Sequence, residues 1–171
     1  MPSIPTNNVE YLLNQINNDD IRVPEFQRSF VWDPQDTRDL IISIAKEYFA
    51  GSLLFWRPPL KAIADRPIEG VKGTSKQPKR LVLDGQQRLT SLYQAFYGTG
   101  KHRFFLDISR LRKNQLDEET VIFFNVREYT KKQLDELSVQ AKENILHLPN
   151  IFSLSWKTEF AKKLLAMKKL M

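Results

Sequence analysis

The sequence predicts an α+β fold in which a mixed β-sheet is flanked by helices. Segments with apolar residues at helical spacing alternate along the chain with short apolar runs that end at turn residues. No internal repeat is present. The chain has 171 residues, 42% of them apolar, which is enough for one domain with a hydrophobic core or one domain with an appendage.

The N-terminal third is expected to contain a helix, a strand and a second helix. The first helix is predicted over residues 7–16, with a capping box that begins at Asn7. A strand or extended segment follows over residues 21–24, because a proline disfavours helix for the residue before it. Asp33, followed by a proline at the first helical position, begins the next helix, which is expected to stop at Gly51.

The rest of the chain is expected to continue with strands, loops and helices. Residues 52–57 are predicted as a buried strand, and residues 58–80, rich in Pro, Gly and Lys, as a loop. A strand over 80–83 then ends at an Asp-Gly turn, and a helix follows up to Gly98. The later elements are expected to be strands over 103–108 and 121–126, a helix over 130–141 and a basic amphipathic helix over 155–171.

Composition excludes several classes of protein. The chain has no cysteine, which excludes a disulfide framework, a thiolate metal site and cysteine catalysis. No stretch approaches the roughly 20 apolar residues that a membrane span requires. The N-terminus lacks the pattern of a signal peptide. We therefore expect a cytoplasmic protein without a membrane partner.

Positive charge is concentrated in the later part of the chain. Residues 1–60 hold five Lys and Arg against eight Asp and Glu, whereas residues 61–171 hold twenty-one against twelve. The formal net charge of +6 therefore comes from the later part. A basic surface of this kind favours polyanionic partners such as DNA, and a lysine-rich solvated surface is the open alternative.

The segment Asp84–Arg88 has the strongest functional signal. It places an acid, a glycine, two amides and an arginine between a strand and a helix. Gly85 allows a sharp turn and a close approach to a ligand. The start of a helix offers unpaired N–H groups to anions, and Arg88 adds a planar fork that suits phosphate oxygens. The segment therefore predicts a phosphate or nucleotide site.

Each residue of this segment has a predicted role and an alternative. Asp84 is expected to hold Mg²⁺ or to orient an attacking water, and its alternative is to cap the helix. Gln86 and Gln87 are candidate catalytic amides, although glutamine is also common in a first helical turn. Arg88 is expected to bind the phosphates of a nucleotide, and its alternative is an ion pair with Asp84 or Asp36.

Gln27 and Arg28 are predicted to complete the site from a different part of the chain. They follow a proline-fixed strand in a segment without regular structure, which is a common way to present binding groups. The alternative for Arg28 is a tether to a helix end, and Arg38 is a further candidate. The aromatic residues of the same segment, Phe26, Phe30 and Trp32, are expected to anchor it in the core.

Three segments of the chain carry a resemblance to a known family. They are Pro24-Glu25-Phe26-Gln27-Arg28-Ser29-Phe30-Val31-Trp32, Gly51-Ser52-Leu53-Leu54 and Leu83-Asp84-Gly85-Gln86-Gln87-Arg88-Leu89. Together they resemble the N-terminal domains of GmrSD-type restriction systems, whose fold is similar to that of the ParB N-terminal domain and of sulfiredoxin. The resemblance is close over residues 7–98 and looser to about residue 130. It implies nucleoside triphosphate binding and Mg²⁺-dependent hydrolysis, coupled to DNA cleavage in defence against phages.

The resemblance also implies a domain division and partners. It assigns residues 1–130 to a ParB-like nucleotide-binding domain and residues 131–171 to a helical extension. Members of the family usually carry a nuclease in a C-terminal half. With two histidines and no nuclease motif, this chain is not expected to cleave DNA alone. Its expected partners are DNA, a nuclease domain in a longer chain or separate subunit, and a second copy of itself.

Two functions therefore remain open from the sequence. One is a regulatory domain that binds and hydrolyses a nucleoside triphosphate with Mg²⁺. The other is a non-enzymatic module that recognises DNA or a DNA modification. Sulfiredoxin-like redox chemistry is excluded because the chain has no cysteine nucleophile.

Overall fold

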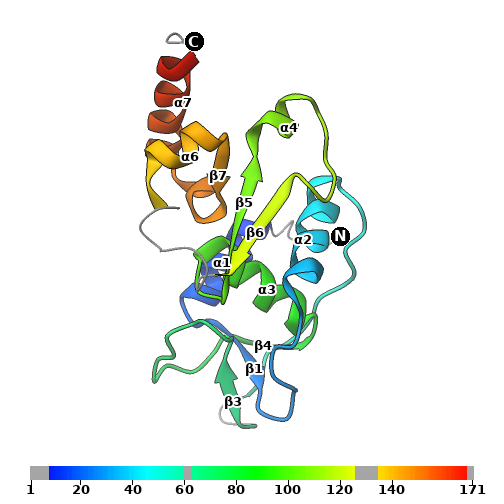
Figure 1. The fold of residues 1–171 in the computed structure, drawn as a ribbon. Coiled ribbons are helices and arrows are strands. Elements are labelled where there is room, and N and C mark those ends of the chain that lie inside the picture. Colours follow the sequence, from blue (N-terminus) through cyan, green and yellow to red (C-terminus); the bar gives the residue numbers. More distant parts are fainter. Residues whose placement is uncertain (1–7, 60–62, 126–134, 169–171) are drawn as a thin grey trace, which may run out of the picture. The chain divides into compact units, whose positions relative to one another are not determined.

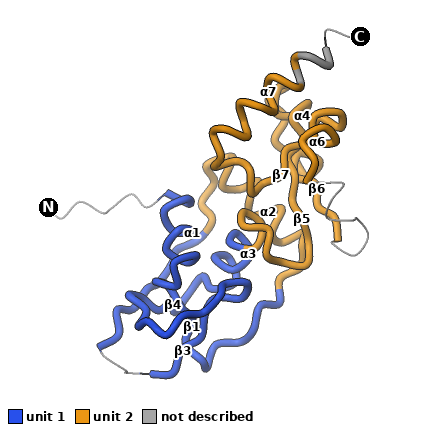
Figure 2. Tube along the Cα trace, turned by 90° about the vertical axis from the view of Figure 1, so that its left-hand side faces the viewer, with its two compact units in different colours: residues 1–31, 51–93 blue, residues 32–50, 94–171 orange. Residues whose placement is uncertain are grey.

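The computed structural model describes residues 8–59, 63–125 and 135–168, which have the α+β fold that the sequence predicts (Figure 1). The chain divides into two compact units (Figure 2). Unit 1 comprises Met1–Val31 and Gly51–Tyr93, and unit 2 comprises Trp32–Ala50 and Gln94–Met171. The predicted domain boundary near residue 130 lies outside the described residues and stays a prediction.

Unit 1 is built on a mixed sheet with the strand order β2-β4-β1-β3. The central pair, β1 and β4, is parallel, and the two outer strands pair antiparallel with it. Buried apolar residues from the helices and the central strands form the core, among them Leu13, Ile16, Ile21, Leu81 and Leu89. The elements are α1 (Val9–Asn17), β1 (Ile21–Pro24), β2 (Leu54–Trp56), β3 (Asp65–Pro67), β4 (Arg80–Asp84) and α3 (Gln86–Tyr97), whose last residues belong to unit 2.

A buried polar network joins β1 to the loop that precedes β4. The Asp19 carboxylate accepts hydrogen bonds from Arg22 Nε at 2.8 Å and from the backbone N–H of Thr74 at 2.7 Å. The other end of the Arg22 guanidinium donates to Asp65 at 3.0 Å. Burial raises the pKa of Asp19, but the hydrogen bonds from Arg22 and Thr74 outweigh it and hold the pKa below its ordinary value.

Unit 2 is built on an antiparallel sheet with the strand order β6-β5-β7. Phe105 on the central strand is fully buried, and α2 packs against β6. The helix α2 begins with the predicted cap: Asp33 and Asp36 form a reciprocal capping box around a proline. The elements are α2 (Pro34–Ala45), β5 (His102–Asp107), α4 (Ile108–Arg112), β6 (Val121–Asn125), α6 (Leu137–Glu143), β7 (Ile145–His147), η1 (Leu148–Phe152) and α7 (Leu154–Lys168).

The structure corrects the prediction at several places. The helix α2 ends at Ala45 and not at Gly51, and β2 is shorter than the predicted buried strand, with Leu54 on it exposed. The N-cap of α1 is Asn8, whose side chain accepts a hydrogen bond from the backbone N–H of Tyr11. The segment 58–80 is not all loop, because it contains β3. The strand β7 and the short helix α4 were not predicted at all. The first part of the helix predicted over 130–141 lies outside the described residues. Among the helices that the structure describes, none is long and apolar enough to span a bilayer.

His147 is a buried histidine in the sheet of unit 2. Its ring stacks on Phe105 with 4.8 Å between ring centres, and its Nδ1 lies 3.4 Å from a carboxylate oxygen of Asp135. Burial lowers the pKa of His147 to about 4, although Asp135 raises it, and Arg103 lowers it further. His147 is therefore neutral at physiological pH, which agrees with the structural role that a lone histidine predicts.

We expect stability to fall as the pH decreases from about 6.5 toward 4, because the unfolded chain then binds a proton at His147 that the folded chain excludes. The difference in pKa corresponds to about 3 kcal/mol once both states are fully protonated. The variant His147→Phe keeps a ring against Phe105. Its urea midpoint should change less between pH 6.5 and 5 than that of the native chain. In the control His102→Phe, the urea midpoint should fall with pH as it does in the native chain. The same fall in His147→Phe would contradict this prediction.

Candidate functional site

The Asp84–Arg88 segment lies where the central strand β4 passes into α3. Asp84 is the last residue of the strand, and Gly85 turns the chain with a φ of +88°. The carbonyl of Gly85 accepts the first helical hydrogen bond, from Leu89 N–H at 3.0 Å. The first N–H groups of a helix have no carbonyl partner within it. The Asp84 side chain, just before this turn, is 67% exposed.

The guanidinium of Arg88 packs against the backbone of two glycines. A Cβ atom at Gly51 would overlap Arg88 Nη1, and a Cβ atom at Gly85 would lie 3.3 Å from Nη2 and overlap a methyl group of Leu53. Both glycines have a positive φ, +86° at Gly51 and +88° at Gly85, which L side chains rarely adopt. The two glycines therefore leave room for the guanidinium against their backbone, where Gly51 is exposed and Gly85 is buried.

Arg88 also forms an ion pair with Asp84. Its Nη2 lies 3.1 Å from a carboxylate oxygen of Asp84, one helical turn away. The Arg88 side chain is 19% exposed, and the Asp84 side chain is 67% exposed. Solvent screens a pair with so exposed a partner, so the pair contributes little to stability and exchanges readily for a stronger anion. The predicted ion pair and the predicted phosphate contact are thus compatible.

The loop over residues 25–31 is held against this turn by side-chain amides. Gln27 Nε2 donates to the carbonyl of Leu83 at 2.8 Å and to that of Val82 at 3.1 Å. From the other side, Gln86 Nε2 donates to the carbonyl of Arg28 at 3.0 Å. The structure therefore brings Gln27 and the backbone of Arg28 to the Asp-Gly turn, as expected.

Gln87 and Arg66 complete the attachment of the loop. Both ends of the Gln87 amide are used: Nε2 donates to the carbonyl of Ser29 at 3.0 Å, and Oε1 accepts from the N–H of Val31 at 2.9 Å. Arg66 Nη2 donates to the carbonyls of Gln27 at 3.1 Å and Arg28 at 3.0 Å. Gln86 is buried and Gln87 is half-buried, so both position the loop. Their predicted catalytic role stays a prediction.

Three sequence-based expectations meet different outcomes. The Arg28 side chain is exposed and, in the part of the chain that the structure describes, forms no hydrogen bond or ion pair. Arg38 is engaged within unit 2, where it pairs with Asp39 at 3.1 Å and with Glu118 at 3.4 Å. Phe26 does not anchor the loop in the core, because it is 76% exposed. Amide hydrogen bonds hold the loop instead.

Asp84 is the one predicted metal ligand in this site. The described residues contain no group of three or more His, Cys, Asp or Glu side chains that would enclose a metal ion. Mg²⁺ often binds to one or two carboxylates and to the phosphates of a substrate. Among the described residues, Asp84 is therefore not part of a carboxylate and histidine cluster that could hold a metal ion by protein ligands alone.

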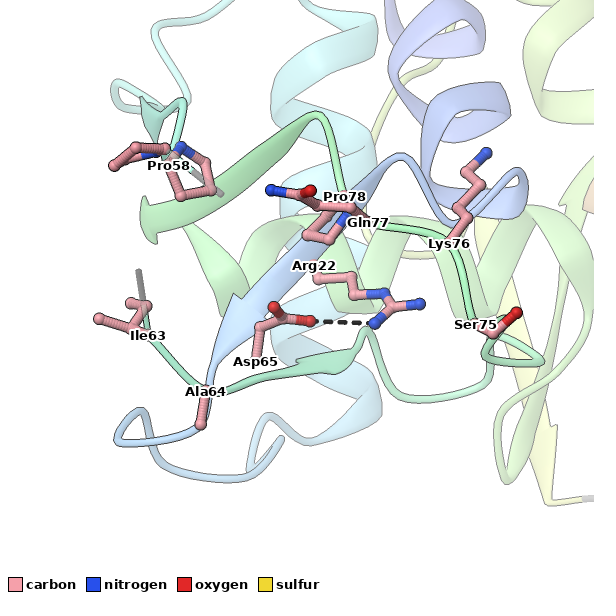
Figure 3. A pocket seen from close by; sticks show the side chains of 10 residues that line it. Arg22, Pro58, Ile63, Ala64, Asp65, Ser75, Lys76, Gln77 and Pro78 are labelled. Atoms are coloured by element: carbon pink, nitrogen blue, oxygen red, sulfur yellow. Dashed lines mark hydrogen bonds and ion pairs between the residues drawn. The ribbon is translucent and has the colours of Figure 1, made fainter. Parts of the chain in front are cut away.

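Unit 1 also contains a hollow of about 380 Å³ that is separate from the predicted site residues (Figure 3). Arg22 points into it but already donates to Asp19, Asp65 and the carbonyl of Thr74. Its charge is therefore neutralised by carboxylates. The lining residues are Arg22, Pro58, Pro59, Ile63, Ala64, Asp65, Ser75, Lys76, Gln77 and Pro78.

Gly51→Ala is expected to destabilise the chain by about 1–2 kcal/mol, because it forces a positive φ on alanine and displaces Arg88. Urea denaturation measures the change. The control is Gly100→Ala, where φ is not positive and the new Cβ would meet the flexible end of the Gln94 side chain, 2.6 Å away. Unchanged stability in Gly51→Ala would mean that Arg88 does not pack on this backbone.

Comparisons with known proteins agree with the motif. A family model described as the N-terminal domain of the GmrSD restriction endonuclease matches residues 9–169. An uncharacterized protein of Methanocaldococcus jannaschii is 35% identical over 127 residues, which is 66% of this chain and 22% of that relative. The chain thus spans about a fifth of the relative's length. No solved structure matches the chain, so the likeness to ParB and sulfiredoxin stays a prediction.

Proposed function

We propose that this chain, which belongs to the family of GmrSD restriction endonuclease N-terminal domains, binds and hydrolyses a nucleoside triphosphate. In this proposal the nucleotide regulates a nuclease that lies elsewhere in a longer protein or in a separate subunit. The length of the relative, of which this chain covers 22%, leaves room for such a part. DNA is then the substrate of the assembled system.

The observation that carries the proposal is the contact of Arg88 with the bare backbone of Gly51 and Gly85. A guanidinium held against glycines near the start of a helix offers N–H donors to phosphate oxygens, and the glycine at position 51 places no Cβ atom beside it on the exposed side. We assign phosphate binding to Arg88, the Gly85 backbone and Arg28. Gln27 holds the loop that carries Arg28.

Asp84 is the proposed ligand of Mg²⁺ or of the attacking water. When bound with the nucleotide, Mg²⁺ would neutralise charge on the phosphate oxygens. Asp84 fits this role because its carboxylate is exposed and, among the described residues, pairs with the Arg88 guanidinium. Gln86 and Gln87 remain candidates for catalytic amides, and their hydrogen bonds to the loop already fix the orientation of both side chains.

Calorimetric titration with each of the four ribonucleoside triphosphates and Mg²⁺ tests the proposal. We expect a Kd in the micromolar range for at least one of them, and phosphate release during longer incubation. Asp84→Asn should abolish phosphate release and keep binding within several-fold of the native chain. Absence of binding to all four nucleotides would contradict the proposal.

The second candidate, DNA recognition without nucleotide, is favoured by one observation. The helix α7 exposes three lysines, Lys157, Lys162 and Lys163, whose charge suits a phosphate backbone, and Lys162 also pairs with Glu159. This function predicts DNA binding that weakens steeply with salt, ignores added nucleotide and survives Asp84→Ala. Gel-shift or anisotropy measurements at two salt concentrations distinguish the two candidates.

A further inference from the structure

Several exposed large apolar side chains of unit 1 lie on segments joined to the Asp84–Arg88 turn. Leu83 directly precedes the turn, and Leu54 pairs with Asp84 across the β2–β4 ladder. In the described part of unit 1 the exposed large apolar side chains are Tyr11, Phe26, Val31, Leu54 and Leu83.

Two further members of this group lie on the loop over residues 25–31. The N–H of Val31 donates to the Gln87 side chain at 2.9 Å, and Phe26 directly precedes Gln27, which bonds to the carbonyl of Leu83. These four exposed side chains of Phe26, Val31, Leu54 and Leu83, the apolar rim, therefore lie on segments joined to the turn that carries Arg88 and Asp84. Exposure of so many apolar side chains at one place is typical of a binding surface.

Phe26 is the most exposed member of the rim, with 76% of its surface accessible. Its exposure does not come from a loose loop, because four side chains from outside and inside the loop hold the backbone around it. A ring on a fixed backbone loses little conformational freedom when a ligand stacks on it. Two residues later, Arg28 is exposed without a partner among the described residues. The loop thus presents an aromatic ring and a cation together.

We propose that Phe26 is the stacking surface for the nucleobase of the nucleotide whose phosphates Arg88 binds. This inference rests on the proposed function. A nucleoside triphosphate joins a planar apolar ring to a polyanion. The loop carries an exposed aromatic ring two residues from the exposed Arg28 side chain, and Gln86 ties this loop to the turn that carries Arg88. A protein partner would use the apolar rim but would not require the cations, and the experiment treats it as a separate outcome.

Calorimetry with two ligands tests this assignment: the tightest-binding nucleoside triphosphate, and inorganic tripolyphosphate, which has the phosphates without a base. We expect Phe26→Ala to weaken nucleotide binding about 10- to 100-fold and to leave tripolyphosphate binding unchanged. Phe26→Tyr, which keeps a stacking ring, should stay within a few-fold of the native chain. Tyr11→Ala removes an exposed aromatic residue away from the turn and should change neither affinity.

Three outcomes would overturn the inference. Equal nucleotide affinity in Phe26→Ala and the native chain would show that the base does not stack there, or that the rim serves a protein, while the proposed function would stand. Equal weakening of both ligands would make Phe26 a structural support of the loop. Failure of the native chain to bind any nucleotide would refute the proposed function itself, and the stacking role with it.

Discussion

Arg88→Ala is expected to lose nucleotide binding while the chain stays folded. A charge-assisted hydrogen bond to phosphate contributes about 1.5–3 kcal/mol, so loss of the guanidinium should weaken binding by at least about 10- to 150-fold. The fold should tolerate the change, because the Arg88 partner Asp84 is 67% exposed and the pair between them is screened. Calorimetry and thermal unfolding of the same samples measure both parts of this prediction.

Two further variants sharpen the test of Arg88. Arg88→Lys keeps the charge but not the planar fork, and we expect it to bind about tenfold more weakly than the native chain. Arg112→Ala removes an equal charge from the exposed surface of α4 and should leave the affinity unchanged. An unfolded Arg88→Ala would make Arg88 a structural tether. Native affinity in a folded Arg88→Ala would place the phosphates elsewhere.

Asp19→Ala is expected to cause the largest loss of stability, about 3–5 kcal/mol. The Asp19 side chain is 1% exposed, and its removal leaves Arg22 buried with only Asp65 as a charged partner. Breaking a buried pair in this way typically costs that amount. Asp19 also has a φ of +58°, which alanine adopts less readily than aspartate. Urea denaturation at pH 7 measures the loss, and Asp39→Ala on an exposed pair is the control.

The contribution of Asp19 also depends on pH. Its pKa is lower in the folded chain than the ordinary value of 3.8, so its stabilisation is complete well above that value and is lost as the pH falls through the folded pKa. The acid unfolding of Asp19→Ala should lack this part of the pH dependence. Asp19→Asn keeps a hydrogen-bond acceptor and tolerates the positive φ. Its stability should lie between that of Asp19→Ala and that of the native chain. A urea midpoint of Asp19→Ala equal to that of the native chain would contradict the prediction.

Local patterns predicted most helices and strands, because their signals lie within a few residues of each other. Asp33 and the proline after it predicted the start of α2, which the capping box confirms. The strand β3 was missed because Asp65–Pro67 has no apolar alternation, and its extended form comes from pairing with β1. Local sequence patterns cannot predict pairing with a strand that lies more than 40 residues away.

Some residues of the candidate site could likewise be predicted from local sequence, and others could not. The grouping of Asp84–Arg88 was visible because its residues are adjacent in the sequence, and the expected approach of Gln27 agrees with its hydrogen bonds to β4. Gly51 and Arg66 were not predicted as parts of the site. Their contacts depend on how distant segments pack, and neither residue carries a local pattern that reveals it.

The strand order of unit 1 also has a consequence for synthesis at the ribosome. The strand β1 ends at Pro24, yet its first neighbour, β3, begins at Asp65 and its parallel neighbour β4 later still. Translation adds roughly 5–20 residues per second, so β1 stays unpaired for on the order of 2–8 s before β3 is synthesised. An unpaired apolar strand invites aggregation, and a charged side chain on it opposes that. Arg22, the second residue of β1, therefore protects the nascent strand before it locks the finished sheet to Asp19.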